Sequence, residues 1–198
     1  MPDVPDLLTQ LVGQQPSLLF ATLLVPHIAA GLTGVVAGAI AMLSPKRTGR
    51  HPNAGRLYFG ALCTVCTTAV GMSAMRWPED AYLVVLGALS LAATSIGLVA
   101  RHRCWPGWIQ LHIVGMGTSY ILLLTAFYVD NGPRLPVWDR LPVLAFWIVP
   151  GLIGCPLIIR ALIRYRARPN ASPTRTITDW SMPEPDSAHR SRYRRAQP

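Results

Sequence analysis

The sequence predicts an all-α protein, a polytopic bundle of transmembrane helices. The main observation is a set of five apolar stretches, each close to the length of about 20 residues that a helix needs to cross a hydrocarbon core about 30 Å thick. A second observation is that only 14% of the residues are charged, against about 25% in soluble domains. The stretches contain no Asp, Glu or Lys, and their only arginine is Arg160. They comprise residues 17–43, 57–75, 82–99, 108–129 and 141–163.

The distribution of positive charge predicts the orientation of the helices. Lys and Arg gather in residues 46–56, in residues 101–103 and from Arg160 onward, whereas the loops at 76–80 and 130–140 are neutral or mixed. Alternate loops are therefore basic, which is typical of cytoplasmic loops. We expect a multi-pass protein of the bacterial inner membrane with its N-terminus outside and its C-terminus in the cytoplasm.

The same charge bears on partners. The net charge of +9 has no accompanying aromatic and basic surface, so it predicts topology and not nucleic-acid binding. Basic cytoplasmic loops would contact anionic lipid head groups. The sequence leaves open a membrane-protein partner or a homo-oligomer.

Three segments follow from this pattern. Residues 1–16 form an extracytoplasmic segment, residues 17–163 the five-helix transmembrane domain, and residues 164–198 a basic cytoplasmic tail. The tail is rich in Pro, Ser and Arg without apolar periodicity, which predicts disorder. The first span lacks a basic segment before it and is too long for a signal peptide, so we expect it to be retained.

Small residues indicate how the helices pack. Gly31, Gly34 and Gly38 follow His27 at helical spacing, so one face of the first span carries all four residues. Such a face allows another backbone to approach closely, which predicts that it points toward protein. In the fourth span, a corresponding face carries His112, Gly115, Met116 and Ser119.

The fifth span contains two proline motifs. Pro150 is followed by glycine, and Pro156 comes after Gly154 and a cysteine. Proline removes a backbone donor and clashes with the preceding turn. We therefore expect the fifth helix to be broken twice, and a broken helix in a membrane must be supported by its neighbours or line a cavity.

Histidines within the spans are candidate ligands for haem or copper, because neutral imidazole is the commonest metal ligand. His27 lies in the outer half of the membrane and His112 near its inner end, so their levels differ by roughly 10–15 Å. One haem shared by these two is therefore not expected. His51 and His112 both belong to the cytoplasmic side and make the better pair. The alternative for each histidine is a structural hydrogen bond to a serine or carbonyl.

We expect a cytoplasmic-side ligand site around this pair, because the second and fourth helices begin at one membrane depth and their N-termini add positive potential. Arg56 would pair with an anionic group such as a haem propionate, lipid phosphate or quinone oxygen. The alternative is that the basic segment before the second span is a turn that only sets the topology and contacts lipid. The candidate ligand-binding residues are His51, Arg56, Tyr58, His112, Met116, Ser119 and Tyr120, with His27, His51 and His112 as candidate metal ligands.

Other motifs argue against catalysis. Cys63 and Cys66 lie within a span, where small apolar packing explains them better than a metal. No nucleophile with a base, nucleotide loop or carboxylate pair is visible. We expect a non-enzymatic protein that binds haem, a metal or another ligand and is linked to redox or respiratory complexes. The alternatives are a small transporter whose fifth helix lines the pathway, although no carboxylate lies within the spans to couple it to protons, and an assembly factor.

Two stretches of the chain resemble a bacterial membrane-protein family known as domain of unknown function 2306. The first runs from His27 to Phe59 and the second from His112 to Pro133, so that the resemblance covers about residues 20–135. It departs at Arg47, where the family often has glycine. The resemblance implies a membrane bundle and supports the choice of histidines, but implies no activity. The motif positions are His27, Gly31, Lys46, His51, Gly55, Arg56, Tyr58, His112, Met116, Ser119 and Tyr120.

Overall fold

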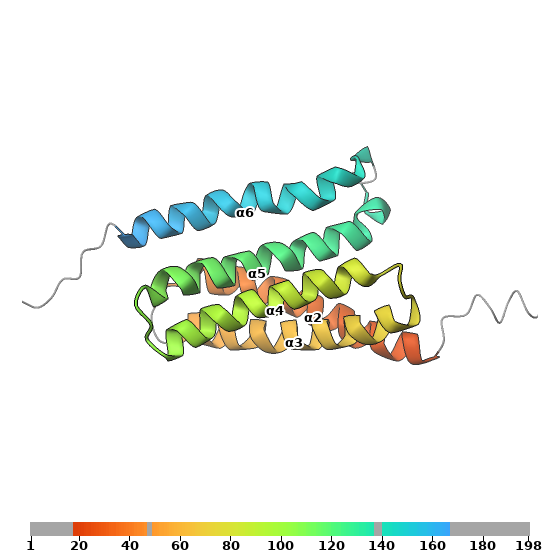
Figure 1. Cartoon of the computed structure of the whole chain (residues 1–198), viewed down its shortest axis with the longest axis horizontal. Coiled ribbons are helices and arrows are strands. Elements are labelled where there is room, and N and C mark those ends of the chain that lie inside the picture. Colours follow the sequence, from red (N-terminus) through yellow and green to blue (C-terminus); the bar gives the residue numbers. More distant parts are fainter. Residues whose placement is uncertain (1–17, 47–48, 137–139, 167–198) are drawn as a thin grey trace, which may run out of the picture. The chain divides into compact units, whose positions relative to one another are not determined.

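The computed structural model describes residues 18–46, 49–136 and 140–166. These residues form the helices α2 (Leu18–Leu43), α3 (Arg50–Met75), α4 (Ala81–His102), α5 (Trp108–Asn131) and α6 (Val143–Arg166), with a short 3₁₀ helix η1 (Gly132–Arg134) after α5 (Figure 1). Five helices are long and apolar enough to cross a membrane, which confirms the all-α bundle. The expectations for residues 1–16 and for the tail beyond residue 166 lie outside the described residues.

The second helix is longer than its apolar stretch. We expected a basic turn before residue 57, but α3 begins at Arg50, directly after Gly49, whose φ of 103° suits glycine. His51, Arg56 and Tyr58 therefore lie on a helix. Hydropathy marks the start of a span at its first apolar residues. The helix itself can begin earlier, because its backbone hydrogen bonds do not depend on the polarity of the side chains. At 26 residues, α3 is about 39 Å long and extends beyond the hydrocarbon core.

The expected breaks in the fifth span are absent. α6 is one continuous helix, with Pro150 and Pro156 inside it. Each proline removes only one backbone donor. A helix in a bilayer satisfies all its other backbone groups internally, whereas an unwound segment would expose several to hydrocarbon. The prediction that this span is broken twice was therefore wrong.

The core forms between two helical hairpins. α2 packs on α3 and α4 packs on α5, while α3 joins the hairpins by contacting α4. The largest buried side chains at the centre include Tyr58, Leu62 and Leu123. Gly34 and Gly38 are buried on the predicted face of α2, but a side chain at Gly31 would meet nothing within 4 Å. The prediction that this face points toward protein is thus confirmed for Gly34 and Gly38, and also for His27, which is hydrogen-bonded to Thr68 of α3, but not for Gly31.

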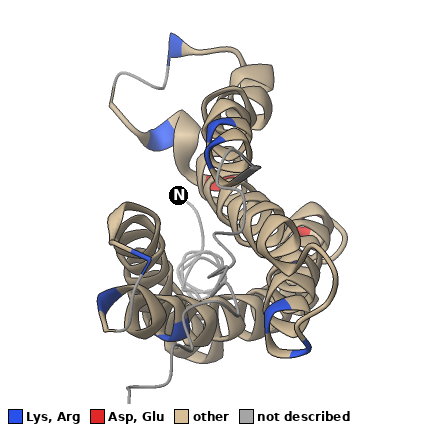
Figure 2. Ribbon diagram, turned by 90° about the vertical axis from the view of Figure 1, so that its left-hand side faces the viewer, with Lys and Arg blue, Asp and Glu red and all other residues tan. Residues whose placement is uncertain are grey.

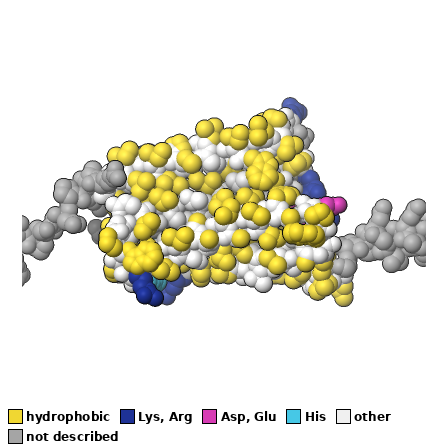
Figure 3. Space-filling view, in the orientation of Figure 1, with side chains coloured by type: hydrophobic (Ala, Val, Ile, Leu, Met, Phe, Trp, Pro, Cys, Tyr) yellow, Lys and Arg dark blue, Asp and Glu magenta, His cyan; other side chains and the backbone are white. Residues whose placement is uncertain are grey.

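α6 lies alongside α5 (Figure 1). Ile158 of α6 contacts Gly117 of α5, and Ile121 of α5 contacts Gly154 of α6. Apolar side chains cover the middle of the face shown in Figure 3, and the visible charged side chains lie toward its ends. Such a surface is suited to surrounding lipid.

Candidate functional site

The three candidate metal ligands, His27, His51 and His112, all form hydrogen bonds through Nδ1. His51 Nδ1 lies 2.8 Å from the carbonyl oxygen of Ala41, and His112 Nδ1 lies 3.2 Å from that of Gly97. A carbonyl can only accept, so Nδ1 of each ring must carry the proton and donate. In a neutral ring, Nε2 is then the acceptor. No hydrogen bond to either Nε2 is formed by the described residues.

His27 also carries its proton on Nδ1, but it donates this proton to a hydroxyl group and not to a backbone carbonyl. Its Nδ1 lies 2.9 Å from Thr68 Oγ1. The Thr68 hydroxyl donates within its own helix, at 2.7 Å to the carbonyl of Thr64. Because a hydroxyl has one proton, Oγ1 accepts from His27 Nδ1. Thr68 follows His51 by 17 positions on α3, or about 25 Å along the axis, so that His27 is a separate site, as predicted.

His51 and His112 lie together at one end of the bundle. Their ring centroids are 6.3 Å apart, in an edge-on arrangement with an interplanar angle of 82°. His51 is in the first turn of α3 and His112 is near the start of α5. Their hydrogen-bond partners belong to α2 and α4, so that four helices position the pair. We call the end formed by Lys46, His51, Arg101 and His112 the two-histidine end. The predicted proximity of the two imidazoles is confirmed.

The two-histidine end is positively charged. Lys46 Nζ donates to the carbonyls of Ala41 and Met42 at 2.8 and 2.9 Å, and partial burial lowers the pKa of this ammonium. Lys46 and Arg101 both act electrostatically on the two imidazoles. Figure 2 looks onto this end and shows Lys and Arg on its loops and helix ends. The sequence analysis missed Arg101 as a site residue, although its place at the inner end of the third span was a usable signal.

The described carboxylates lie far from the pair. Glu79 and Asp80 precede α4, and Asp130 is at the end of α5, all at the opposite end of the bundle. The potential around the two imidazoles is therefore positive, which favours a ligand that carries negative groups.

Arg56 does not join the pair. It follows His51 by five positions on α3, which places it about 140° around the helix. Its side chain is exposed, and Nη2 donates to Asn53 Oδ1 at 2.7 Å. The structure therefore places Lys46 and Arg101, and not Arg56, beside the histidines.

Tyr58 and Ser119 form a buried polar link one level deeper. The Tyr58 hydroxyl and Ser119 Oγ are 2.6 Å apart, and these residues are 1% and 0% exposed. Ser90 Oγ donates to the carbonyl of Ser119 at 2.9 Å. Thr94 lies beside the Tyr58 hydroxyl, but its buried Oγ1 has no partner in hydrogen-bond geometry. This network joins α3, α4 and α5.

Tyr120 and Met116 also face the core. Tyr120 donates to the carbonyl of Val35 at 3.0 Å, and its ring centroid is 6.2 Å from that of Tyr58. Both rings pack against Gly38, where an added Cβ would come within 2.5 Å of Tyr120. Met116 packs on the central cluster. Tyr120 and Met116 therefore pack between the helices, deeper in the bundle than the histidine pair.

The side chains present limit what metal sites the described residues can form. Among residues 18–46, 49–136 and 140–166, no three His, Cys, Asp or Glu side chains lie close enough to hold one ion. Cys66 Sγ donates to the carbonyl of Gly87 at 3.4 Å, which agrees with a packing role. Of these described residues, His51 and His112 would therefore supply two nitrogen ligands to a metal at the two-histidine end.

The fold and its polar interior define a polytopic α-helical membrane protein. Within this class, the chain belongs to the family described as predicted membrane protein (DUF2306), whose model matches residues 24–153. The match extends past residue 135, where the resemblance in the sequence ended, and reaches into α6. No curated protein and no solved structure matches the chain.

Proposed function

We propose that this protein is a non-enzymatic membrane protein that binds a haem, or another ligand containing a metal, through His51 and His112. The observation that supports this most is the arrangement of the two rings, each of which donates Nδ1–H to a backbone carbonyl. Histidines that bind metals usually donate their other ring N–H in this way, which fixes the tautomer and orients the ring. Nε2 of both residues is then available.

The spacing of the rings agrees with a shared metal. With each nitrogen about 2.0 Å from the ion, opposed ligands place their ring centroids roughly 6 Å apart and tetrahedral ones roughly 5 Å apart. The observed separation of 6.3 Å is short enough for both imidazoles to hold one ion, such as the iron of a haem.

Charge favours haem over a bare metal ion. A copper ion would be repelled by Lys46 and Arg101, which face no described carboxylate. The propionates of a haem would instead pair with these cations. Haem supplies one-electron chemistry when bound, so we extend the proposal to a role beside redox or respiratory complexes.

The test is the visible spectrum and metal content of the full-length protein purified in detergent, before and after reconstitution with haem or copper. We expect a Soret band that His51→Ala and His112→Ala each reduce strongly and that the double variant reduces little further, because both residues serve one ligand. His102→Ala is the matched control, since His102 is exposed and its Nδ1 also lies near a carbonyl, at 3.4 Å from Leu98.

The proposal has clear contrary outcomes. It fails if the reconstituted protein shows neither a Soret band nor stoichiometric metal. It also fails if the two histidine substitutions act independently and additively. The transporter alternative rested on a broken fifth helix, and because α6 is continuous we do not pursue it.

We also propose that the two-histidine end faces the cytoplasm of a bacterial cell. The support is the positive charge on its loops and helix ends, which include Arg50 and Arg103 besides Lys46 and Arg101. An impermeant thiol reagent applied to intact cells should label Asp6→Cys but not Ser187→Cys, each made in a background without native cysteines. Labelling of Ser187→Cys from outside would reverse this orientation.

A further inference from the structure

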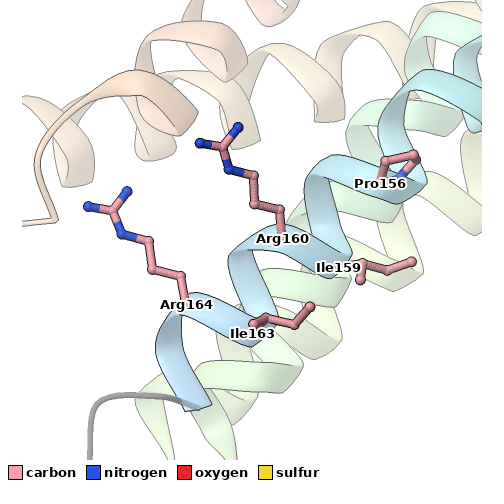
Figure 4. Close-up of a pocket in the computed structure, with 5 residues that line it drawn as sticks. All are labelled: Pro156, Ile159, Arg160, Ile163 and Arg164. Carbon is pink, nitrogen blue, oxygen red and sulfur yellow. The ribbon is translucent and has the colours of Figure 1, made fainter.

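The inner half of α6 carries an arginine pair that the histidine site does not use. Arg160 and Arg164 are four residues apart, about 6 Å along the helix axis. Both are exposed. Figure 4 shows their guanidinium groups extending from one flank of α6 in the same direction. Together with Pro156, Ile159 and Ile163, which belong to the same helix, they line a shallow, open groove on the surface of α6.

The depth of the pair places it at the head-group level of a bilayer. α6 begins at Val143, so that Arg160 lies about 26 Å and Arg164 about 32 Å along it. A hydrocarbon core is about 30 Å thick. An arginine at this depth extends its guanidinium toward the polar layer while its stem stays on apolar surface.

The charge of the pair is not balanced by the described residues. Glu79, Asp80 and Asp130 belong to the other end of the bundle, and no ion pair to Arg160 or Arg164 forms within residues 18–46, 49–136 and 140–166. Charged side chains in membrane segments need a partner. At this depth the bilayer supplies phosphate groups as a counter-charge.

The groove joins that charge to an apolar wall. Ile159 and Ile163 extend from the flank of α6 away from the arginines (Figure 4), and they are largely exposed, at 55% and 64%. A ligand that fits both surfaces has a phosphate for the guanidinium groups and acyl chains for the isoleucines. Guanidinium groups bind phosphate oxygens by charge-assisted hydrogen bonds. We propose that this groove binds an anionic phospholipid, with its phosphate on Arg160 and Arg164 and an acyl chain along Ile159 and Ile163.

The site is independent of the proposed haem function, because it uses no residue of the two-histidine end. We would test it by native mass spectrometry of the full-length protein in detergent, titrated with phosphatidylglycerol or with phosphatidylcholine of the same acyl chains. We expect phosphatidylglycerol to bind preferentially, and Arg160→Gln with Arg164→Gln to weaken that binding at least about tenfold, the effect of losing charge-assisted hydrogen bonds.

The control removes the same charge elsewhere. Arg134→Gln with Arg140→Gln, both exposed positions at the other end of the bundle, should leave phosphatidylglycerol binding within about twofold of the unmodified protein, because only surface charge away from the groove is lost. Glycerol phosphate should not displace the lipid, because it lacks acyl chains for the apolar wall.

Three results would overturn the proposal. The first is equal phosphatidylglycerol binding by the unmodified protein and the Arg160 and Arg164 variant, which is also the result expected if carboxylates outside the described residues neutralise the pair. The second is equal binding of the two lipids. The third is full displacement by glycerol phosphate, which would make the groove a site for a free phosphate and not for a lipid.

Discussion

The close contact between α4 and α5 gives a sharp test of how the histidine site is held. A Cβ added at Gly115 would lie 2.5 Å from the carbonyl oxygen of Ala93 and 3.0 Å from the Cα of Gly97. These are backbone atoms, so that no side-chain rotation can relieve the clash. Gly115→Ala must therefore push the two helices apart, and the same displacement lengthens the bond from His112 Nδ1 to the Gly97 carbonyl, now 3.2 Å.

The expected cost follows from that displacement. Restoring ordinary carbon contacts of about 3.5 Å or more requires a shift of roughly 0.5–1 Å, which forfeits a quarter to a half of the dispersion energy along the interface. Overpacking of this kind costs about 1–3 kcal/mol. Alanine in a helix returns up to about 1 kcal/mol relative to glycine. We therefore expect Gly115→Ala to lower the free energy of unfolding by up to about 2 kcal/mol.

Gly97→Ala is the matched control on the same interface. Its added Cβ would meet the nearest atoms at 3.5 Å, which is an ordinary contact, so only the helix-propensity gain remains and we expect this variant to be as stable as the unmodified protein or up to about 1 kcal/mol more stable. The assay is reversible unfolding of the two variants by SDS in mixed micelles. If Gly115→Ala proves as stable as Gly97→Ala, then the helices are not as close as the structure places them, and the argument fails.

Two further predictions concern buried hydroxyl groups and use the same unfolding assay. Tyr58→Phe and Ser119→Ala should show a coupling of about 0.6–1.7 kcal/mol in a double-mutant cycle, the range measured for hydrogen bonds between membrane helices; strictly additive effects would contradict a direct bond. Thr68→Val should lower the free energy of unfolding by about 1 kcal/mol because it removes the acceptor of His27 Nδ1–H. Thr67→Val loses only a hydroxyl bond within its own helix and should be nearly neutral. Equal losses of stability in the two variants would count against the His27 bond.

The shared membrane depth of His51 and His112 could be predicted from the sequence, whereas their closeness in the membrane plane depends on how the helices pack. Both residues lie near the start of a helix, and both helices start at the same face of the bilayer. The partners of the pair could not be predicted in this way. Ala41 and Gly97 hold the rings through backbone carbonyls, which have no signature in the residue type. Arg56 was chosen for its charge, but the helical start at Arg50 turns it away from the pair.

The roles of Tyr58 and Ser119 changed for a similar reason. Both were predicted as ligand-binding residues from their position toward the cytoplasmic ends of the second and fourth helices. The structure shows them bonded to each other in the core, with Ser90 as an additional donor. That bond depends on α3, α4 and α5 meeting at one level, and helix adjacency is not readable from one sequence. Their role in binding a ligand stays a prediction.

The sequence by itself determined that this protein is a bundle of five membrane helices, because the bilayer requires long apolar helices and excludes charge from their middles. It also determined which positions could hold polar groups in the interior. Only the tertiary structure decided which of those groups meet, that α6 stays continuous through two prolines, and that cations surround the histidine pair. These features arise from contacts between helices distant in sequence, whose choice depends on close packing and not on hydropathy.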